Sequence, residues 1–257
     1  MKKFIYDLIR KGIKLFIKGE IISKKYDKYN KVLYYERGQH LTFLFQSKIK
    51  YEENIQNKLS QYIKKEDLVF DIGGNIGQYA IPFSELVGNK GRVISFEPDY
   101  KNFSFLQFNI NINRCTNVTC LNYGLGNNDI NQEFYRDTKT GGRMGSFKKE
   151  FVGNNFEGYT DTVIIKKFDS LISEYGIPAF VKIDVEGFEK EVLSGLTLNF
   201  QNSIFLIEVR EETKNYIFNF FKEKGYQCLW VDGDDKLINS IEELPGFANL
   251  IFKNASR

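Results

Sequence analysis

Short apolar runs recur along the chain after residue 67 and alternate with amphipathic stretches. The runs lie at 68–72, 92–97, 118–123, 180–185, 203–209, 227–231 and 248–252. The amphipathic stretches, which have the spacing of helices, lie at 51–63, 76–88, 102–113, 188–196 and 213–225. Strands that alternate with helices predict an α/β fold, with a mostly parallel sheet that is covered by helices on both faces. Pro82 predicts that the second helix is kinked or holds this residue within its first turns.

The interval 129–165 breaks this alternation. Polar residues and five glycines fill it, and the runs 133–137 and 162–168 near its two ends have the composition of strands. We expect an inserted hairpin with a long loop. Such loops often cover active sites, although a simple surface excursion is an equal alternative.

The first 50 residues differ from the rest, and we divide the chain into a basic N-terminal extension, 1–50, and a domain, 51–257. Within 1–20, apolar residues have helical spacing and lysine or arginine fills most positions between them. One interpretation is a basic amphipathic helix that lies on an anionic membrane. The favoured one is a helix that packs on its own domain and leaves its basic face in water.

The bulk composition narrows the class of protein. The chain has 257 residues, a formal net charge of +3 and 42% hydrophobic residues, which suits a globular domain with a core and does not point to nucleic acid. The cysteines Cys115, Cys120 and Cys228 form no C-x-x-C pair, and there is one histidine, so a zinc site or a disulfide framework is disfavoured. No apolar run is long enough to span a bilayer, and charges interrupt any signal-peptide core. We expect a cytoplasmic protein, peripheral to the membrane if residues 1–20 bind lipid.

A glycine-rich turn follows the first strand of the domain. The strand ends in Asp71, and the turn contains Gly73, Gly74 and Gly77. Glycine lets the backbone bend sharply and lets a ligand approach closely, and such sheets bind nucleotides at this edge. Asn75 replaces the second glycine of the dinucleotide motif, and Asp71 would oppose a pyrophosphate. The pattern therefore favours S-adenosylmethionine, whose cationic amino-acid part suits a carboxylate, over NAD.

A second carboxylate stands at the end of the next strand. Glu97 lies twenty residues after Gly77, at the spacing where an acid accepts both ribose hydroxyls of a nucleotide cofactor. NAD and S-adenosylmethionine both need this contact, so Glu97 does not choose between them. Together, Asp71 and Glu97 predict a nucleoside site that spans two neighbouring strands.

Three segments of the domain resemble the FkbM-type methyltransferases: VFDIGGNIGQY at 69–79, RVISFEPDYKNFSFLQFNININ at 92–113 and FVKIDVEGFEKEVLSGL at 180–196. The resemblance runs from about residue 51 to 252. It implies a Rossmann-like class I methyltransferase fold, with a seven-stranded, mostly parallel sheet whose last strand, at 248–252, is antiparallel. It also implies O-methylation of hydroxyls on sugars, glycans, glycolipids or other natural products.

The resemblance also implies the residues that bind S-adenosylmethionine. Those near its methionine half would be Asp71, Gly73, Gly74, Asn75, Gly77, Gln78 and Tyr79. Gly74 stands where the family often has alanine. Glu97 would hold the ribose, and Asn122 to Gly124 would lie near the adenine.

Methyl transfer to a hydroxyl needs a group that removes the acceptor's proton. Asp184 and Glu186 end the fourth strand and Glu208 ends the fifth, so the three carboxylates should converge on the same cleft. Asp184 is favoured as the general base. Glu186 is as well suited to capping the helix that follows, and either of the first two acids could instead pair with Lys182.

Two further candidates are weaker. Asp184 and Glu208 have places comparable to the magnesium-binding acids of catechol-type O-methyltransferases. Those enzymes carry asparagine where this chain has Val209, so a divalent metal is not favoured. His40 is the only histidine and a conceivable base, but it lies outside the segments that resemble the family.

Other functions stay open. A nucleic-acid methyltransferase is weakened because the chain has no Asn/Asp-Pro-Pro-aromatic motif and no cysteine after a proline. A non-catalytic module that binds S-adenosylmethionine would show the same pocket.

Overall fold

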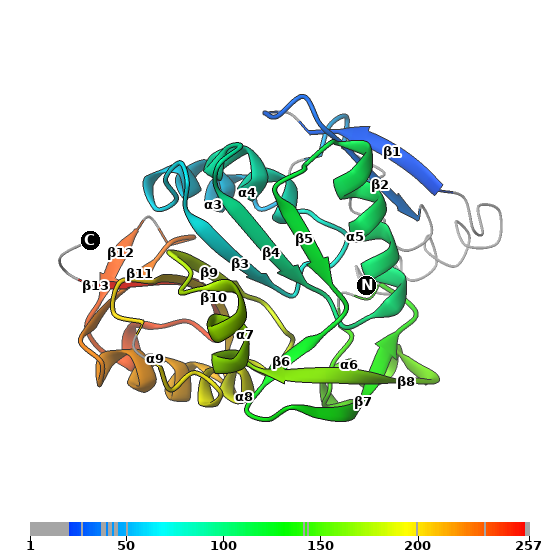
Figure 1. Ribbon diagram of the computed structural model, residues 1–257. Coiled ribbons are helices and arrows are strands. Elements are labelled where there is room, and N and C mark those ends of the chain that lie inside the picture. Colours follow the sequence, from blue (N-terminus) through cyan, green and yellow to red (C-terminus); the bar gives the residue numbers. More distant parts are fainter. Residues whose placement is uncertain are drawn as a thin grey trace.

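A mixed sheet of eight strands forms the centre of the computed structural model (Figure 1), which describes residues 21–254 except 27, 37–39, 41–42, 44–45, 50, 141, 143, 199 and 234. The strand order is β12-β11-β13-β10-β9-β3-β4-β5. The strands are β3 (Leu68–Ile72), β4 (Arg92–Phe96), β5 (Val118–Leu121), β9 (Phe180–Ile183), β10 (Ile204–Arg210), β11 (Tyr226–Trp230), β12 (Lys236–Ile238) and β13 (Phe247–Asn254). All seven predicted runs are therefore strands of one sheet.

The sheet has eight strands and not the seven expected, and three of its strand pairs are antiparallel. The added strand is β12, which pairs antiparallel with β11 at the sheet edge through Cys228 and Ile238. A three-residue strand is too short to show a period of two, so the hydrophobic pattern does not reveal it. The run expected to be antiparallel is β13, and it pairs antiparallel with both β10 and β11. The other pairs, from β10 through β5, are parallel.

Helices pack on both faces of the sheet, as predicted. On one face, α3 (Glu53–Lys58), the 3-10 turn η1 (Leu59–Gln61) and α4 (Ala80–Val87) cover a core that contains Val69, Phe83 and Phe180. On the other, α7 (Phe168–Tyr175), α8 (Glu189–Ser194) and α9 (Lys214–Lys222) cover Phe70 and Phe205. Alternate residues of each buried strand face opposite layers, which is why the strands read as nearly continuous apolar runs. Pro82 is the third residue of α4, within its first turn.

The inserted hairpin is confirmed. β7 (Ile130–Asp137) pairs antiparallel with β8 (Phe156–Lys167), and β6 (Gly124–Gly126) adds a third, parallel strand to β8. The long connection between β7 and β8 contains α6 (Lys149–Val152) and the 3-10 turn η2 (Gly153–Asn155). Outside the insertion, one more 3-10 turn, η3 (Ile241–Glu243), precedes β13. Figure 1 shows this small sheet beside the main sheet, near α8.

A two-stranded sheet of β1 (Ile21–Lys25) and β2 (Val32–Glu36) packs on α5 (Tyr100–Ile112), in a part of the chain where the sequence predicted no elements. The backbone N–H and C=O of Tyr34 both bond to the amide of Asn109, at 2.7 and 2.9 Å. Those of Val32 bond in the same way to Asn113, at 2.8 and 2.6 Å. Four residues of helix rise about 6 Å and two residues of strand about 6.6 Å, so the two asparagines match alternate residues of the strand edge.

The predicted amphipathic helix at 1–20, with its membrane contact, lies outside the described residues. Among the helices that the structure does describe, none has the length and apolar character needed to cross a bilayer.

Asn109→Ala tests the attachment of β2 to α5. The fully buried Asn109 amide also donates to the carbonyl of Ile76 at 2.8 Å, so the substitution leaves three backbone groups without their partner. We expect the free energy of unfolding to fall by about 2–3 kcal/mol, seen as a decrease in Tm of roughly 5–10 °C. Asn111→Ala, at an exposed position of the same helix, is the control and should change Tm little. Equal Tm values for the two variants would contradict this role of Asn109.

Candidate functional site

A cavity of about 310 Å³ opens at the carboxyl ends of β3, β4, β9 and β10. This is the edge where ligands bind in doubly wound sheets, and the volume lies within the usual range for small-molecule sites. Residues of the first half of the chain that line it include Gly73, Asn75, Gln78, Glu97, Tyr123 and Gly124. Those of the second half include Asp184, Glu186, Glu208, Arg210 and Phe247.

The glycine loop, residues 73–77, lines this cavity and has positive φ angles at Gly73 and Asn75. Gly73 has φ +85°, and a side chain there would overlap the carbonyl oxygen of Asp184. The amides of Gly73 and Gly74 both donate to the carbonyl of Phe96, at 3.0 and 2.9 Å. Asn75 also has a left-handed backbone, with φ 48°, a conformation that asparagine tolerates better than most residues. The loop is thus bent between β4 and β9, with its backbone facing the cavity.

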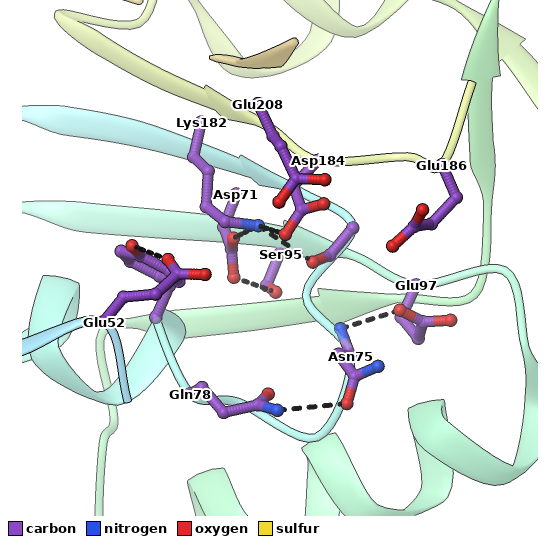
Figure 2. Close-up of polar contacts among 12 residues, drawn as sticks. Glu52, Asp71, Asn75, Gln78, Ser95, Glu97, Lys182, Asp184, Glu186 and Glu208 are labelled. Carbon is purple, nitrogen blue, oxygen red and sulfur yellow. Dashed lines mark hydrogen bonds and ion pairs between the residues drawn. The ribbon is translucent and has the colours of Figure 1, made fainter. Parts of the chain in front are cut away.

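Glu97 lies buried beside this loop. Its carboxylate accepts a hydrogen bond from the backbone N–H of Asn75 at 2.7 Å (Figure 2), and a second from the backbone N–H of Asp99 at 2.9 Å. Burial raises the pKa of Glu97 to about 8, and the negative charge of Asp99 adds to the shift. Asn122 donates to the carbonyls of Glu97 and Pro98, at 2.8 and 3.1 Å, and so joins the ends of β4 and β5.

Asp71 lies behind the glycine loop and does not reach the cavity wall. Its side chain has no exposed surface, and it accepts a hydrogen bond from Ser95 Oγ at 2.8 Å. Gly74 and Gly77 also pack inward, against Ser95 and Leu106. Burial raises the pKa of Asp71, while Ser95 and the nearby Lys182 act in the opposite direction.

Lys182 is a buried cation, whereas the sequence indicated only that it could pair with a neighbouring carboxylate. Its Nζ lies 3.8 Å from Asp71 and 3.2 Å from Asp184, and donates to the carbonyl of Gly73 at 3.2 Å. Figure 2 shows these groups converging on the ammonium. Burial lowers the pKa of Lys182, but Asp184, Asp71 and Glu52 outweigh it, so the net shift is upward. A lysine inside the apolar run FVKI was the available signal, because lysine is rarely buried without a partner.

Tyr79 and Glu52 complete this buried group. The Lys182 ammonium lies 5.0 Å from the centre of the Tyr79 ring, and the Tyr79 hydroxyl donates to Glu52. Glu52 is another residue that the sequence did not identify. Burial raises its pKa, and the charge of Asp184 adds to the shift. Of the residues assigned to the methionine half, only Gly73, Asn75 and Gln78 line the cavity.

Asp184, Glu186 and Glu208 do converge, with oxygen atoms within 4.8 Å of one another. Asp184 pairs with Lys182, while Glu186 and Glu208 both pair with Arg210, at 2.6 and 2.8 Å. Burial raises the pKa of Glu208 to about 9, and the charges of Asp184 and Glu186 add to the shift. Glu186 thus bonds to a guanidinium, and at the start of α8 it is Glu189 that accepts from the Gly187 amide, at 3.0 Å.

The connection between β7 and β8 forms part of the cavity wall through Gly142, Met144, Gly145 and Phe147. Ser146 Oγ donates to the carbonyl of Glu186 at 2.8 Å, and Lys148 Nζ to that of Gly187 at 2.9 Å. The loop is thus attached directly to the turn that carries Glu186, which fits the first of the two interpretations of the insertion.

His40 lies apart from the three carboxylates Asp184, Glu186 and Glu208. It is buried, with its ring 5.8 Å from Phe43, and it lines a smaller cavity together with Asp99 and Arg136. It does not line the larger cavity.

The three carboxylates have the oxygen donors that a hard divalent cation prefers, but Arg210 already lies between two of them. Two unit charges of the same sign 4 Å apart repel by about 4 kcal/mol at an effective dielectric constant of 20, and a divalent ion would double this. With Arg210 bonded to Glu186 and Glu208, these residues do not fit a metal ion.

Lys182→Met tests the buried charge network. We expect the free energy of unfolding in urea to fall by about 3–5 kcal/mol, because Asp71 is left as a buried charge without its cation. The double variant Asp71→Asn/Lys182→Met should recover part of this loss, since it buries no unpaired charge at these two positions. Lys64→Met, at an exposed position, is the control. A double variant no more stable than Lys182→Met would rule out the pairing.

One curated protein and two solved structures that are similar to this chain are methyltransferases by name. The hexuronic acid methyltransferase AglP of Haloferax volcanii is 29% identical over 158 residues, which is 61% of this chain and 61% of that protein. The chain therefore matches less than two thirds of this relative's length. A methyltransferase FkbM structure from Methylobacillus flagellatus is 20% identical, with a TM-score of 0.47. The matched region covers 73% of this chain and 43% of the chain in that structure.

A precorrin-6y C5,15-methyltransferase structure from Geobacter metallireducens is 14% identical, with a TM-score of 0.49. The matched region covers 80% of this chain and 90% of the chain in that structure. The family model of the methyltransferase FkbM domain matches residues 71–228, well over half of the sequence. The chain thus belongs to the FkbM methyltransferase domain family.

Proposed function

We propose that this protein transfers the methyl group of S-adenosylmethionine to a hydroxyl of a sugar, a glycan or a related natural product. The observation that carries the proposal is that one cavity joins Glu97 and the glycine loop to the carboxylates Asp184 and Glu208. A cofactor and an acceptor bound in this cavity would lie next to each other, which is the main requirement of an in-line transfer.

The residues at the Glu97 side of the cavity suit the nucleoside. Each carboxylate oxygen of Glu97 accepts one backbone hydrogen bond and keeps a lone pair for one hydroxyl of the ribose. Tyr123 and Gly124 line the cavity where the adenine is expected. The nearby carboxylates suit the positive charge of the cofactor, which supplies an activated methyl group when bound.

The other side of the cavity suits a polyhydroxylated acceptor. Asp184, Glu186 and Glu208 offer acceptors for sugar hydroxyls, and the rings of Phe188 and Phe247 offer apolar surface for the C–H face of a sugar. The relative from Haloferax volcanii is named a hexuronic acid methyltransferase, which supports an acceptor of the sugar class.

Asp184 is the proposed general base. It is the least buried of the three carboxylates, and Lys182 holds it in place from below. Glu186 and Glu208 are both bonded to the Arg210 guanidinium, at 2.6 and 2.8 Å, and are therefore less available than Asp184 to accept the proton of a hydroxyl.

The concentration of carboxylates at this end argues against a nucleic acid as acceptor, because they would repel its phosphates. A non-catalytic binding module remains the alternative to an enzyme. It would bind S-adenosylhomocysteine and be insensitive to the loss of the Asp184 carboxylate.

The raised pKa of Glu97 gives the nucleoside site a pH dependence. Below pH 8 one oxygen of Glu97 carries a proton, which must leave before both ribose hydroxyls can donate to the carboxylate. We expect the affinity for S-adenosylhomocysteine, measured by calorimetry, to rise roughly tenfold from pH 7 to pH 9 relative to Glu97→Gln. Taking the ratio of the two proteins cancels the titration of the ligand's own amino group. A ratio that stays constant would refute ribose binding by ionised Glu97.

Asp184→Asn separates enzyme from binding module. We expect turnover to fall by about 10²–10⁴-fold, while the affinity for S-adenosylhomocysteine changes less than threefold. The assay follows radiolabelled methyl transfer from S-adenosylmethionine to methyl glycosides of hexuronic acids and neutral hexoses, with Glu223→Gln, at an exposed position, as the control. Full activity in Asp184→Asn would exclude this residue as the base.

A further inference from the structure

We propose that Arg210 is the built-in cation of the acceptor site: its guanidinium takes the place of a metal ion between Glu186 and Glu208 and donates to the acceptor oxygen during methyl transfer. Only the second half of this inference, donation to the acceptor oxygen, rests on the proposed function. The first half concerns the charge arrangement of the site and can be tested without turnover.

Arg210 is the last residue of β10, and this position places its side chain for the role. It follows Glu208 by two positions, so both side chains leave the strand on the same face. Its partner across the antiparallel pair is Phe247 of β13, and the guanidinium lies 5.5 Å from the centre of that ring. A strand and an aromatic ring thus hold the cation at the wall of the cavity, with 25% of its side chain exposed.

Each carboxylate of the cluster already has a cation within ion-pair distance. Asp184 has Lys182 at 3.2 Å, and Glu186 and Glu208 share one terminal nitrogen of Arg210, at 2.6 and 2.8 Å. A divalent ion bound by the three acids would have to displace the guanidinium or lie against it. The arrangement therefore excludes the ion that its oxygen donors would otherwise attract.

The guanidinium also has donors to spare. Arginine carries five N–H groups, and both bonds to Glu186 and Glu208 use the same nitrogen, Nη2. The other terminal nitrogen, Nη1, is bonded to no residue in the described part of the chain and keeps exposed surface. An acceptor oxygen in the cavity would supply a partner for donors that the protein leaves unsatisfied.

Such a donor stabilises the charge that develops on the acceptor oxygen. That oxygen gives its proton to the Asp184 carboxylate and forms a bond to the methyl carbon, while the electron pair of the broken carbon–sulfur bond stays on the sulfur. Arg210 remains protonated throughout, since its pKa is too high for it to give up its own proton.

A titration with Mn²⁺ tests the cation role. We expect the wild-type protein to show no binding below millimolar Mn²⁺. Arg210→Met, which keeps an unbranched stem but removes the guanidinium and its charge, should bind at least tenfold more tightly and gain thermal stability from the ion. Arg210→Met/Glu208→Gln, which lacks one ligand, should lose this gain. Micromolar Mn²⁺ binding by the wild type, or no gain in Arg210→Met, would overturn the inference.

The acceptor role is tested with Arg210→Lys, which keeps the charge and guards against misfolding of the methionine variant. We expect this variant still to exclude Mn²⁺ and to bind S-adenosylhomocysteine within threefold of wild type, while turnover falls about 100-fold. Wild-type turnover should be unaffected by EDTA. Full turnover in Arg210→Lys would refute the donor role, whereas failure to bind S-adenosylhomocysteine in any variant would refute the proposed function instead.

Discussion

The ammonium of Lys182, buried between β3 and the glycine loop, is the interaction on which the rest of the site depends. It neutralises a carboxylate that water cannot reach, bonds to the backbone of the loop and pairs with Asp184 at the cavity wall. Without a cation at this point, Asp71 and Asp184 would repel each other across adjacent strands. A single charge therefore links the bend of the loop to the position of the group that faces the acceptor.

Arg210 repeats this principle on the other side of Asp184. Among the described residues, Lys182 of β9 pairs with Asp184, and Arg210 at the end of β10 pairs with Glu186 and Glu208. Ion pairs of this kind contribute little net stability when partly buried. Their value lies in geometry, because each carboxylate is held in one direction by a partner on a rigid strand.

The parts of the molecule that follow a local rule were predictable. Buried strands, covering helices, the glycine loop and the convergence of Asp184 and Glu208 all follow from periodicity and from the direction of parallel strands. What the sequence did not reveal depends on contacts between distant segments. Lys182 is marked only by its place in an apolar run, Arg210 looks like an ordinary charge, and Glu52 stands at the start of the predicted helix at 51–63, where an acid is common. The strand β12 is too short to have a period, and the pairing of β2 with a helix has no signature of its own.

That last pairing has a consequence for how firmly the N-terminal hairpin is held. In most hairpins the turn fixes which residues face each other. Here Asn109 of α5 and Asn113, which caps the end of α5 four residues later, bond to alternate peptide groups of β2, so the helix fixes the position of the strand. The turn between β1 and β2 shares this duty, since the Tyr26 N–H closes it on the carbonyl of Lys31, and β2 is thus held in register from both of its edges.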